Sequence, residues 1–214
     1  MNKTIGFIGL GVMGFPMAGH LSKIFEVSVF NRSHSKSEKW KKNFSGTSYN
    51  SIKEISSNSE ILILCVGNDK DVKEIICGKD GAIDFLKPGS IIIDHTTTSS
   101  DLTIELSSLL KPKKILIVEG ILILCNITLK SQINYNVFLE CSRDTRLKRR
   151  LERDTSERGR NHEDVIKLFE NRLDKMHRNY VEPIKKECDL ILNTENNSKI
   201  DVLIEIINKN LSEK

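Results

Sequence analysis

The feature that most constrains the fold is a six-residue segment with three glycines, Gly9-Leu10-Gly11-Val12-Met13-Gly14. It follows an apolar run at residues 4–9, typical of a buried strand, and opens residues 13–24, whose apolar positions have helical spacing. Here Gly9 would permit a tight turn, Gly11 would leave room for a pyrophosphate against the backbone, and Gly14 would let the helix pack on the strand. Phosphate oxygens would lie at the helix N-terminus, where free N–H groups favour anions. The segment predicts a dinucleotide site, with a purely structural glycine-rich turn as the alternative.

The rest of the first 110 residues alternates short apolar runs with helical stretches. Strands are predicted at residues 27–31, 61–66 and 90–94, and helices at residues 35–43, 69–77 and 99–110. Apolar strands separated by helices indicate a parallel sheet covered on both faces. We therefore predict an α/β fold, a doubly wound parallel sheet of the Rossmann type with strand order 3-2-1-4-5-6. Residues 114–119 would supply the sixth strand, beside residues 90–94.

The predicted second strand ends in Asn31-Arg32-Ser33, and these residues bear on which dinucleotide binds. A site for NAD has Asp or Glu there, to accept a hydrogen bond from the ribose 2′-hydroxyl. Arg32 can instead pair with a 2′-phosphate, and Asn31 and Ser33 can donate hydrogen bonds to it. The sequence therefore predicts NADP over NAD; the alternative is that Arg32 is an ordinary surface arginine.

This first segment resembles the β-hydroxyacid dehydrogenase family, which includes 3-hydroxyisobutyrate dehydrogenases and glyoxylate/succinic semialdehyde reductases. The resemblance runs through residues 5–18, 29–33, 64–69 and 89–100. It implies NADP use, a contact from Thr96 to the cofactor, and a nicotinamide side lined by Cys65, Val66, Gly67 and Asn68. Family members continue with a Ser-Gly-Gly substrate loop and a helical domain that carries a catalytic lysine and an asparagine. Nothing after residue 110 resembles these parts, so the catalytic residues are unknown.

The composition changes after residue 110, because ten of the twelve glycines precede that point and the whole net charge of +4 follows it. Strands are predicted at residues 114–119, 135–141 and 189–192, and helices at residues 143–154, 161–180 and 200–211. Residues 113–193 resemble uridine kinases, above all through R-D-T-S-E-R-G-R at residues 153–160. By that resemblance Arg153, Arg158 and Arg160 belong to a lid that closes over nucleotide phosphates, which arginine binds with paired hydrogen bonds.

The kinase resemblance is incomplete. The sequence contains no P-loop of the form GxxxxGK[ST], and it lacks the nucleoside-binding carboxylate and aromatic positions that precede the matching stretch in the family. The second segment is therefore expected to be a partial kinase-like α/β unit without its P-loop. The resemblance adds ATP with Mg²⁺ as a second candidate cofactor, at this segment.

The whole chain is expected to hold an NADP-binding domain at residues 1–110 and a uridine-kinase-like segment at residues 111–214. The main prediction is the NADP-binding domain of a 3-hydroxyisobutyrate dehydrogenase-like oxidoreductase, with its substrate domain replaced by the kinase-like segment. Dinucleotide binding is then favoured over full turnover. A nucleoside kinase-like phosphotransferase and a non-catalytic fusion product are the alternatives.

Several kinds of partner and site are not expected. The five histidines are scattered, so no metal site is predicted. The basic run at residues 143–160 has no interleaved aromatics, which disfavours nucleic-acid binding, and no apolar run is long enough for a membrane span. Five single cysteines without a CxxC pair favour buried, reduced thiols in a cytoplasmic protein. A homo-oligomer is one of the assemblies compatible with the sequence.

Overall fold

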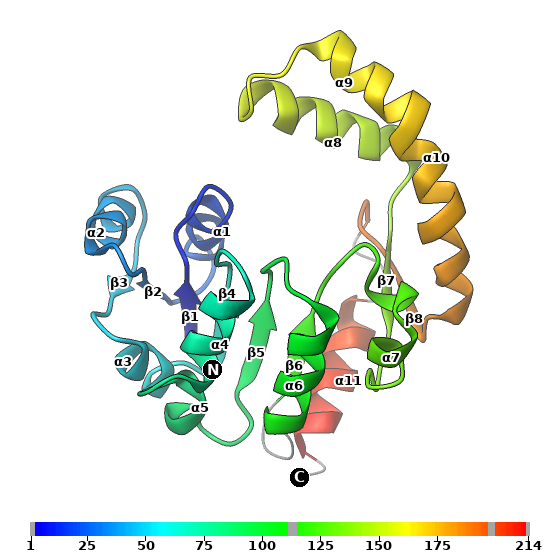
Figure 1. Ribbon diagram of the computed structural model, residues 1–214. Helices are drawn as coiled ribbons and strands as arrows, with labels where there is room; N and C mark the ends of the chain where they lie inside the picture. The colour runs from blue at the N-terminus through cyan, green and yellow to red at the C-terminus, as the bar shows by residue number, and fades with distance from the viewer. Residues whose placement is uncertain (1–2, 111–114, 197–199, 213–214) are drawn as a thin grey trace. The chain divides into compact units, whose positions relative to one another are not determined.

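The protein forms two compact units, Met1–Gly120 and Ile121–Lys214, in a computed structural model that describes residues 3–110, 115–196 and 200–212 (Figure 1). The first unit extends beyond the boundary that the sequence suggested at residue 110. The reason is that strand β6 (Ile115–Val118) pairs with the strand before it, and therefore belongs to the first unit.

The first unit is built on a six-stranded parallel sheet with the strand order β3-β2-β1-β4-β5-β6. Its other strands are β1 (Ile5–Ile8), β2 (Val27–Phe30), β3 (Thr47–Ser48), β4 (Ile61–Leu64) and β5 (Ile91–Asp94). Residues of β5 and β6 pair in register, from Ile91 opposite Ile115 to Asp94 opposite Val118. The predicted order 3-2-1-4-5-6, with the sixth strand beside the fifth, is confirmed.

Helices cover both faces of this sheet. The apolar side chains of its strands point to both faces, and they form one core cluster on each face. One cluster joins Leu62, Leu64 and Ile92 to the helices α3 (Ile52–Ser57), α4 (Asp69–Cys77), α5 (Ala82–Phe85) and α6 (Ser100–Leu110). The other joins Phe7 and Val29 to α1 (Gly14–Leu21) and α2 (His34–Asn43). Both faces are thus buried, as a doubly wound fold requires.

The second unit contains two parallel strands, β7 (Val137–Glu140) and β8 (Leu190–Asn193). Its helical elements are η1 (Ile123–Cys125), α7 (Ile127–Lys130), α8 (Arg143–Ser156), α9 (His162–Leu168), η2 (Phe169–Leu173), α10 (Asp174–Met176), η3 (His177–Val181), η4 (Glu182–Glu187) and α11 (Ile200–Ser212). Residues 161–180 were expected to form one α-helix, but η2 and η3 are π-helical turns. Apolar spacing alone does not distinguish such turns from α-helix.

The core of the second unit is small. Among the described residues, its buried apolar residues are Leu129, Val165, Phe169, Leu190 and Leu192. Within the described part of the chain, β7 pairs with β8 on one side and with no strand on the other, and Leu139 of β7 is 64% exposed. The second unit is thus a partial α/β unit, as the sequence predicts, and among the described residues its strand β7 also has an unpaired edge.

Two further expectations concern cysteines and membrane helices. The five cysteines are free, but the prediction that they are buried is wrong for Cys125, which is exposed, and the other four are half-buried. No helix in the described parts of the chain has both the length and the apolar character needed to cross a membrane.

Candidate nucleotide-binding sites

The glycine-rich turn between β1 and α1 has the geometry that its sequence predicts. Gly9 has φ +102°, in the left-handed region that favours glycine, and a Cβ there would overlap the carbonyl oxygen of Cys65. A Cβ at Gly14 would overlap the carbonyl oxygen of Gly9, so helix and turn approach too closely for any side chain. A Cβ at Gly11 would meet no protein atom within 4 Å. Gly11 is therefore the position where the backbone is open to a ligand.

The N-terminus of α1 follows this turn and is free to bind an anion. Met13 is its N-cap residue, and no side chain caps the helix. Val12 and Met13 are 86% and 48% exposed. Uncapped N–H groups at a helix N-terminus, next to an open glycine, form a site suited to phosphate oxygens.

Asn31 connects the glycine-rich turn to the end of β2. Its Oδ1 accepts a hydrogen bond of 2.9 Å from the Leu10 N–H, and its Nδ2 donates one of 3.1 Å to the Ser33 carbonyl. The Gly9 N–H also donates to the Phe30 carbonyl, at 3.1 Å. Asn31 thus holds the turn in place, a role that reasoning from the sequence did not assign to it.

Arg32 lies beside this anchor with its side chain 87% exposed. Its Nη1 is 3.5 Å from Oδ1 of Asp71, which lies in the first turn of α4. Ser33 precedes α2 as its N-cap residue, and its side chain makes no capping hydrogen bond. Sequence reasoning missed Asp71, because no spacing relates residues so far apart in the chain.

The segments after β4 and β5 are tied together at the same edge of the sheet. The Val66 N–H donates to Oγ1 of Thr96 at 3.1 Å, and the Thr96 N–H donates to Oδ1 of Asp94 at 2.8 Å. Burial raises the pKa of the Asp94 carboxyl, against the hydrogen bonds from Thr96, and burial also raises the pKa of the Cys65 thiol. Asn68 caps α4 by accepting from the Asp71 N–H at 3.1 Å.

The predicted dinucleotide residues are therefore brought together. The segments 9–14, 31–33 and 65–68 and Thr96 all follow strands of one parallel sheet, so they lie at its carboxyl edge. Glu119, which follows β6, reaches the same edge, where its Oε1 is 3.6 Å from Nδ1 of His95. In doubly wound sheets ligands bind outside this edge, at the point where the strand order reverses.

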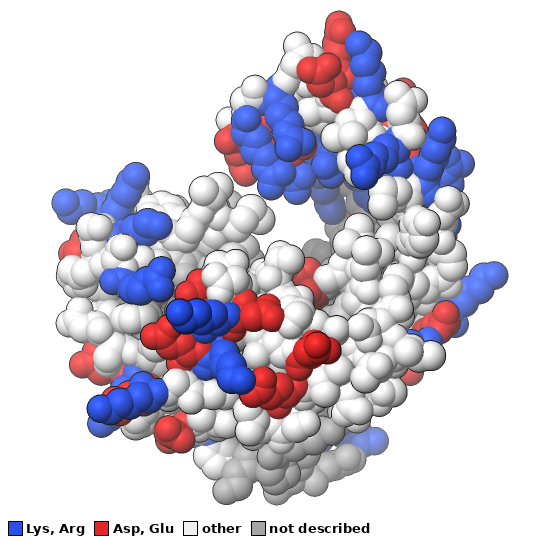
Figure 2. Space-filling view, viewed as in Figure 1, with Lys and Arg blue, Asp and Glu red and all other residues white. Residues whose placement is uncertain are grey.

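A second cluster, in the other unit, surrounds Asp154 on α8. The Asp154 side chain is fully buried, and the guanidinium groups of Arg153, Arg158 and Arg160 lie 2.9, 3.4 and 3.4 Å from its oxygens. Arg150, not singled out from the sequence, is a fourth partner at 3.6 Å. Burial by itself would raise the pKa of this carboxyl, but the hydrogen bond from Arg153 and the arginine charges lower it. Four arginines around one carboxylate leave an excess of positive charge, and basic side chains gather over α8 and α9 in Figure 2.

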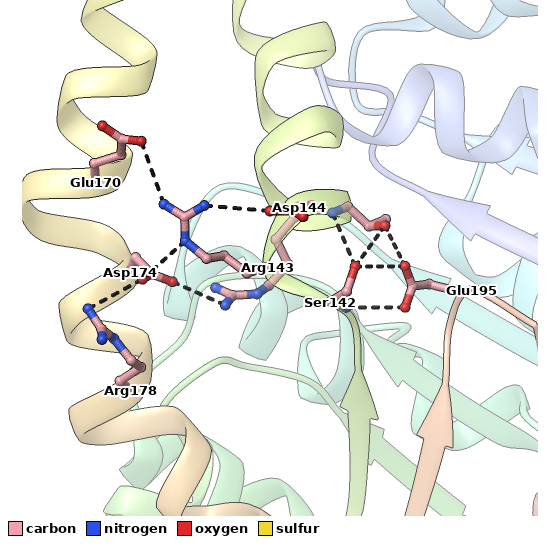
Figure 3. Close-up of polar contacts among 9 residues, drawn as sticks. Ser142, Arg143, Asp144, Glu170, Asp174, Arg178 and Glu195 are labelled. Atoms are coloured by element: carbon pink, nitrogen blue, oxygen red, sulfur yellow. Dashed lines mark hydrogen bonds and ion pairs between the residues drawn. The ribbon is translucent and has the colours of Figure 1, made fainter.

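A further ion-pair network joins α8 to α10 and to the π-helical turns η2 and η3 on either side of α10 (Figure 3). Asp174 pairs with Arg143, Arg146 and Arg178 at 3.4, 3.3 and 3.5 Å. At the start of α8, Glu195 accepts hydrogen bonds from the side chains of Ser142 and Thr145. Ser142 itself caps α8 by accepting from the Thr145 N–H, and no local pattern in the sequence predicted the contacts of Glu195.

A cavity of about 340 Å³ adjoins the network, and Arg143, Arg146, His177 and Glu195 contribute to its lining. Burial and the charge of Arg146 lower the pKa of His177. Within the described residues, no group of three or more His, Cys, Asp or Glu side chains is arranged to hold a metal ion.

Two family models match the chain. Residues 4–120 match the NAD-binding domain of 6-phosphogluconate dehydrogenase, and residues 90–201 match the phosphoribulokinase/uridine kinase family. The two matches overlap over residues 90–120, the segment that contains β5, α6 and β6.

Individual relatives divide in the same way. An uncharacterised oxidoreductase of Shewanella frigidimarina is 38% identical over 117 residues, 54% of this chain and 40% of that protein. The uridine kinase of Staphylococcus haemolyticus is 36% identical over 109 residues, 51% of this chain and 50% of the kinase. The fold of 3-hydroxyisobutyrate dehydrogenase from Mycobacterium tuberculosis is similar, with a TM-score of 0.50, 22% identity, and coverage of 56% of this chain and 43% of that chain. The chain spans about half the length of the curated relatives it matches, or less.

Proposed function

The chain belongs to the family of the 6-phosphogluconate dehydrogenase NAD-binding domain through residues 4–120 and to the phosphoribulokinase/uridine kinase family through residues 90–201, and from this premise we propose that its first unit binds NADP(H). The observation that carries the proposal is the glycine-rich turn. Gly9 and Gly14 have no room for a side chain, whereas Gly11 has open space beside it. The protein itself makes no use of that space, and a pyrophosphate bound at the N-terminus of α1 would.

The residues after β2 support NADP over NAD. Arg32 belongs to the segment after β2 where an NAD site has a carboxylate, and its side chain is 87% exposed. A guanidinium pairs well with a phosphate dianion, and the neighbouring Ser33 hydroxyl is not used as a helix cap. The adenosine 2′-phosphate would therefore be held by Arg32 and Ser33, with Asn31 fixing their position.

The nicotinamide half would lie over the other half of the sheet, where Cys65, Val66, Gly67, Asn68 and Thr96 follow β4 and β5. The hydrogen bonds from Val66 to Thr96 and from Thr96 to Asp94 hold these segments in one arrangement. A bound nicotinamide would supply hydride chemistry there. Binding of the cofactor is therefore the function proposed.

Fluorescence titration with NADPH and NADH tests the proposal on the full chain. NADPH is expected to bind more tightly than NADH, and Arg32→Gln is expected to abolish most of that preference while leaving NADH binding unchanged. The exposed Lys36→Gln in α2 is a matched control that removes one positive charge near the same strand end. Tighter binding of NADH than of NADPH by the unaltered chain would refute the assignment of NADP.

For the second unit we propose a nucleotide-phosphate site at the arginines around Asp154, with ATP and Mg²⁺ as the family's ligands. The carboxylate of Asp154 is contacted by three arginines, Arg153, Arg158 and Arg160. Their positive charge exceeds its single negative charge, so the cluster can attract a phosphate. ATP binding and phosphate transfer to uridine are the two measurements. Binding without transfer would support a phosphate site alone, and the absence of both would exclude this second function.

A further inference from the structure

Arg32, the group proposed to hold the 2′-phosphate, has an anionic partner within the protein itself. Its Nη1 lies 3.5 Å from Oδ1 of Asp71. Arg32 follows β2 and Asp71 lies in the helix that follows β4, and these two strands flank β1 on either side. The ion pair therefore spans the carboxyl end of β1, the place where the strand order reverses and where a dinucleotide binds.

The Asp71 side chain is much less exposed than that of Arg32, and its backbone is held in place. The Asp71 N–H donates to the Asn68 side chain at 3.1 Å, which places Asp71 in the capped first turn of α4. Its side chain is 24% exposed, against 87% for Arg32. A Cβ at Gly67 would come within 2.7 Å of Oδ2 of Asp71, so the carboxylate lies close over the Gly67 backbone, where the absence of a side chain leaves it room.

We propose that Asp71 is a specificity-determining residue of the dinucleotide site, acting against the 2′-phosphate. The inference rests on the proposed NADP(H) binding. Asp71 pairs with Arg32, and a 2′-phosphate must compete with Asp71 for the guanidinium while lying close to the carboxylate's negative charge. A ribose 2′-hydroxyl carries no charge and does not compete for Arg32. Asp71 therefore lowers the preference for phosphorylated over unphosphorylated adenosine ligands.

Adenosine 2′,5′-bisphosphate and 5′-AMP are the probes that isolate this half of the site, and calorimetric titration of the full chain measures both. Asp71→Asn keeps the size of the side chain and removes its charge. It is expected to tighten binding of adenosine 2′,5′-bisphosphate by about two- to fivefold, the range of a partly exposed ion pair, and to leave 5′-AMP unchanged. The gain should shrink in high salt, because salt screens the charges involved.

Asp101→Asn is the matched control, because it removes an acidic residue from the first turn of another helix of the same unit, α6. It should change neither affinity. An unchanged ratio of the two affinities in Asp71→Asn, or weaker binding of adenosine 2′,5′-bisphosphate, would overturn the inference even if the unaltered chain binds NADPH. Failure of the unaltered chain to bind either probe would instead refute the proposed function, and the inference with it.

Discussion

Substitutions of two glycines in the turn after β1 should separate ligand binding from stability. A Cβ at Gly11 meets no protein atom within 4 Å, so Gly11→Ala introduces no clash. The backbone of Gly11 is outside the left-handed region, so alanine is tolerated there. By restricting the unfolded chain, the substitution should stabilise the protein by about 0.4–1 kcal/mol. The same methyl group would lie where a pyrophosphate approaches the backbone, and we expect NADPH affinity to fall at least about tenfold, or ~1.4 kcal/mol.

Gly14→Ala is the contrasting variant. Its Cβ would overlap the carbonyl oxygen of Gly9 and approach the Phe7 ring at 3.1 Å, so turn and helix must move apart. Overpacking of this kind costs about 1–3 kcal/mol, which should lower the melting temperature by several degrees. Thermal unfolding followed by circular dichroism and NADPH fluorescence titration measure the two effects. The reasoning is refuted if Gly11→Ala binds NADPH with the same affinity as the unaltered chain, or if its melting temperature falls as much as that of Gly14→Ala.

Three predictions concern the second unit and the boundary. Asp154→Asn should destabilise the protein by roughly 1–3 kcal/mol in urea unfolding, because four arginines lose their buried counter-ion; an unchanged midpoint would contradict this. Burial lowers the pKa of His177 in the folded protein, so the unfolded chain binds a proton at this residue more readily. The free energy of unfolding should therefore decrease as the pH falls from about 7 through 6.5 towards the lowered pKa of the folded state. His177→Gln should flatten that dependence, and an equal slope in both proteins would argue against it. Limited proteolysis should leave a resistant fragment that includes β6, and mass spectrometry showing one that ends near residue 110 would be the contrary result.

The fold of the first unit could be predicted almost entirely from the sequence. Its strands are short, nearly continuous apolar runs, and its glycines occur where the backbone needs them. The strand order followed from general rules for doubly wound sheets, and the later placement of β6 beside β5 confirmed it. The missed elements were β3 and the short helices α3 and α5, which are too brief for apolar periodicity to reveal.

The second unit shows where sequence reasoning stops. Both family resemblances are confirmed by the matching family models, and α8 was predicted within two residues at its C-terminal end. The partners of its charged side chains were not foreseen. Asp174 pairs with three arginines, and Glu195 accepts hydrogen bonds from Ser142 and Thr145 at the start of α8, yet nothing in the local pattern around either acidic residue predicts these contacts. Such contacts depend on the tertiary arrangement of distant segments, as does the pair between Arg32 and Asp71.

The strand β6 has a consequence for how chains of this kind arise. A sheet edge accepts any apolar strand of suitable length that arrives after a right-handed crossover, because parallel pairing uses backbone groups and is indifferent to the origin of the side chains. β5, α6 and β6 satisfy two family patterns at once, and β6 has the same length as β5 and pairs with it residue for residue. A genetic junction placed at this crossover would leave the first core closed. One edge strand thus completes the sheet of the first unit while belonging to both family patterns, whereas β7 of the second unit has only β8 as a partner among the described strands.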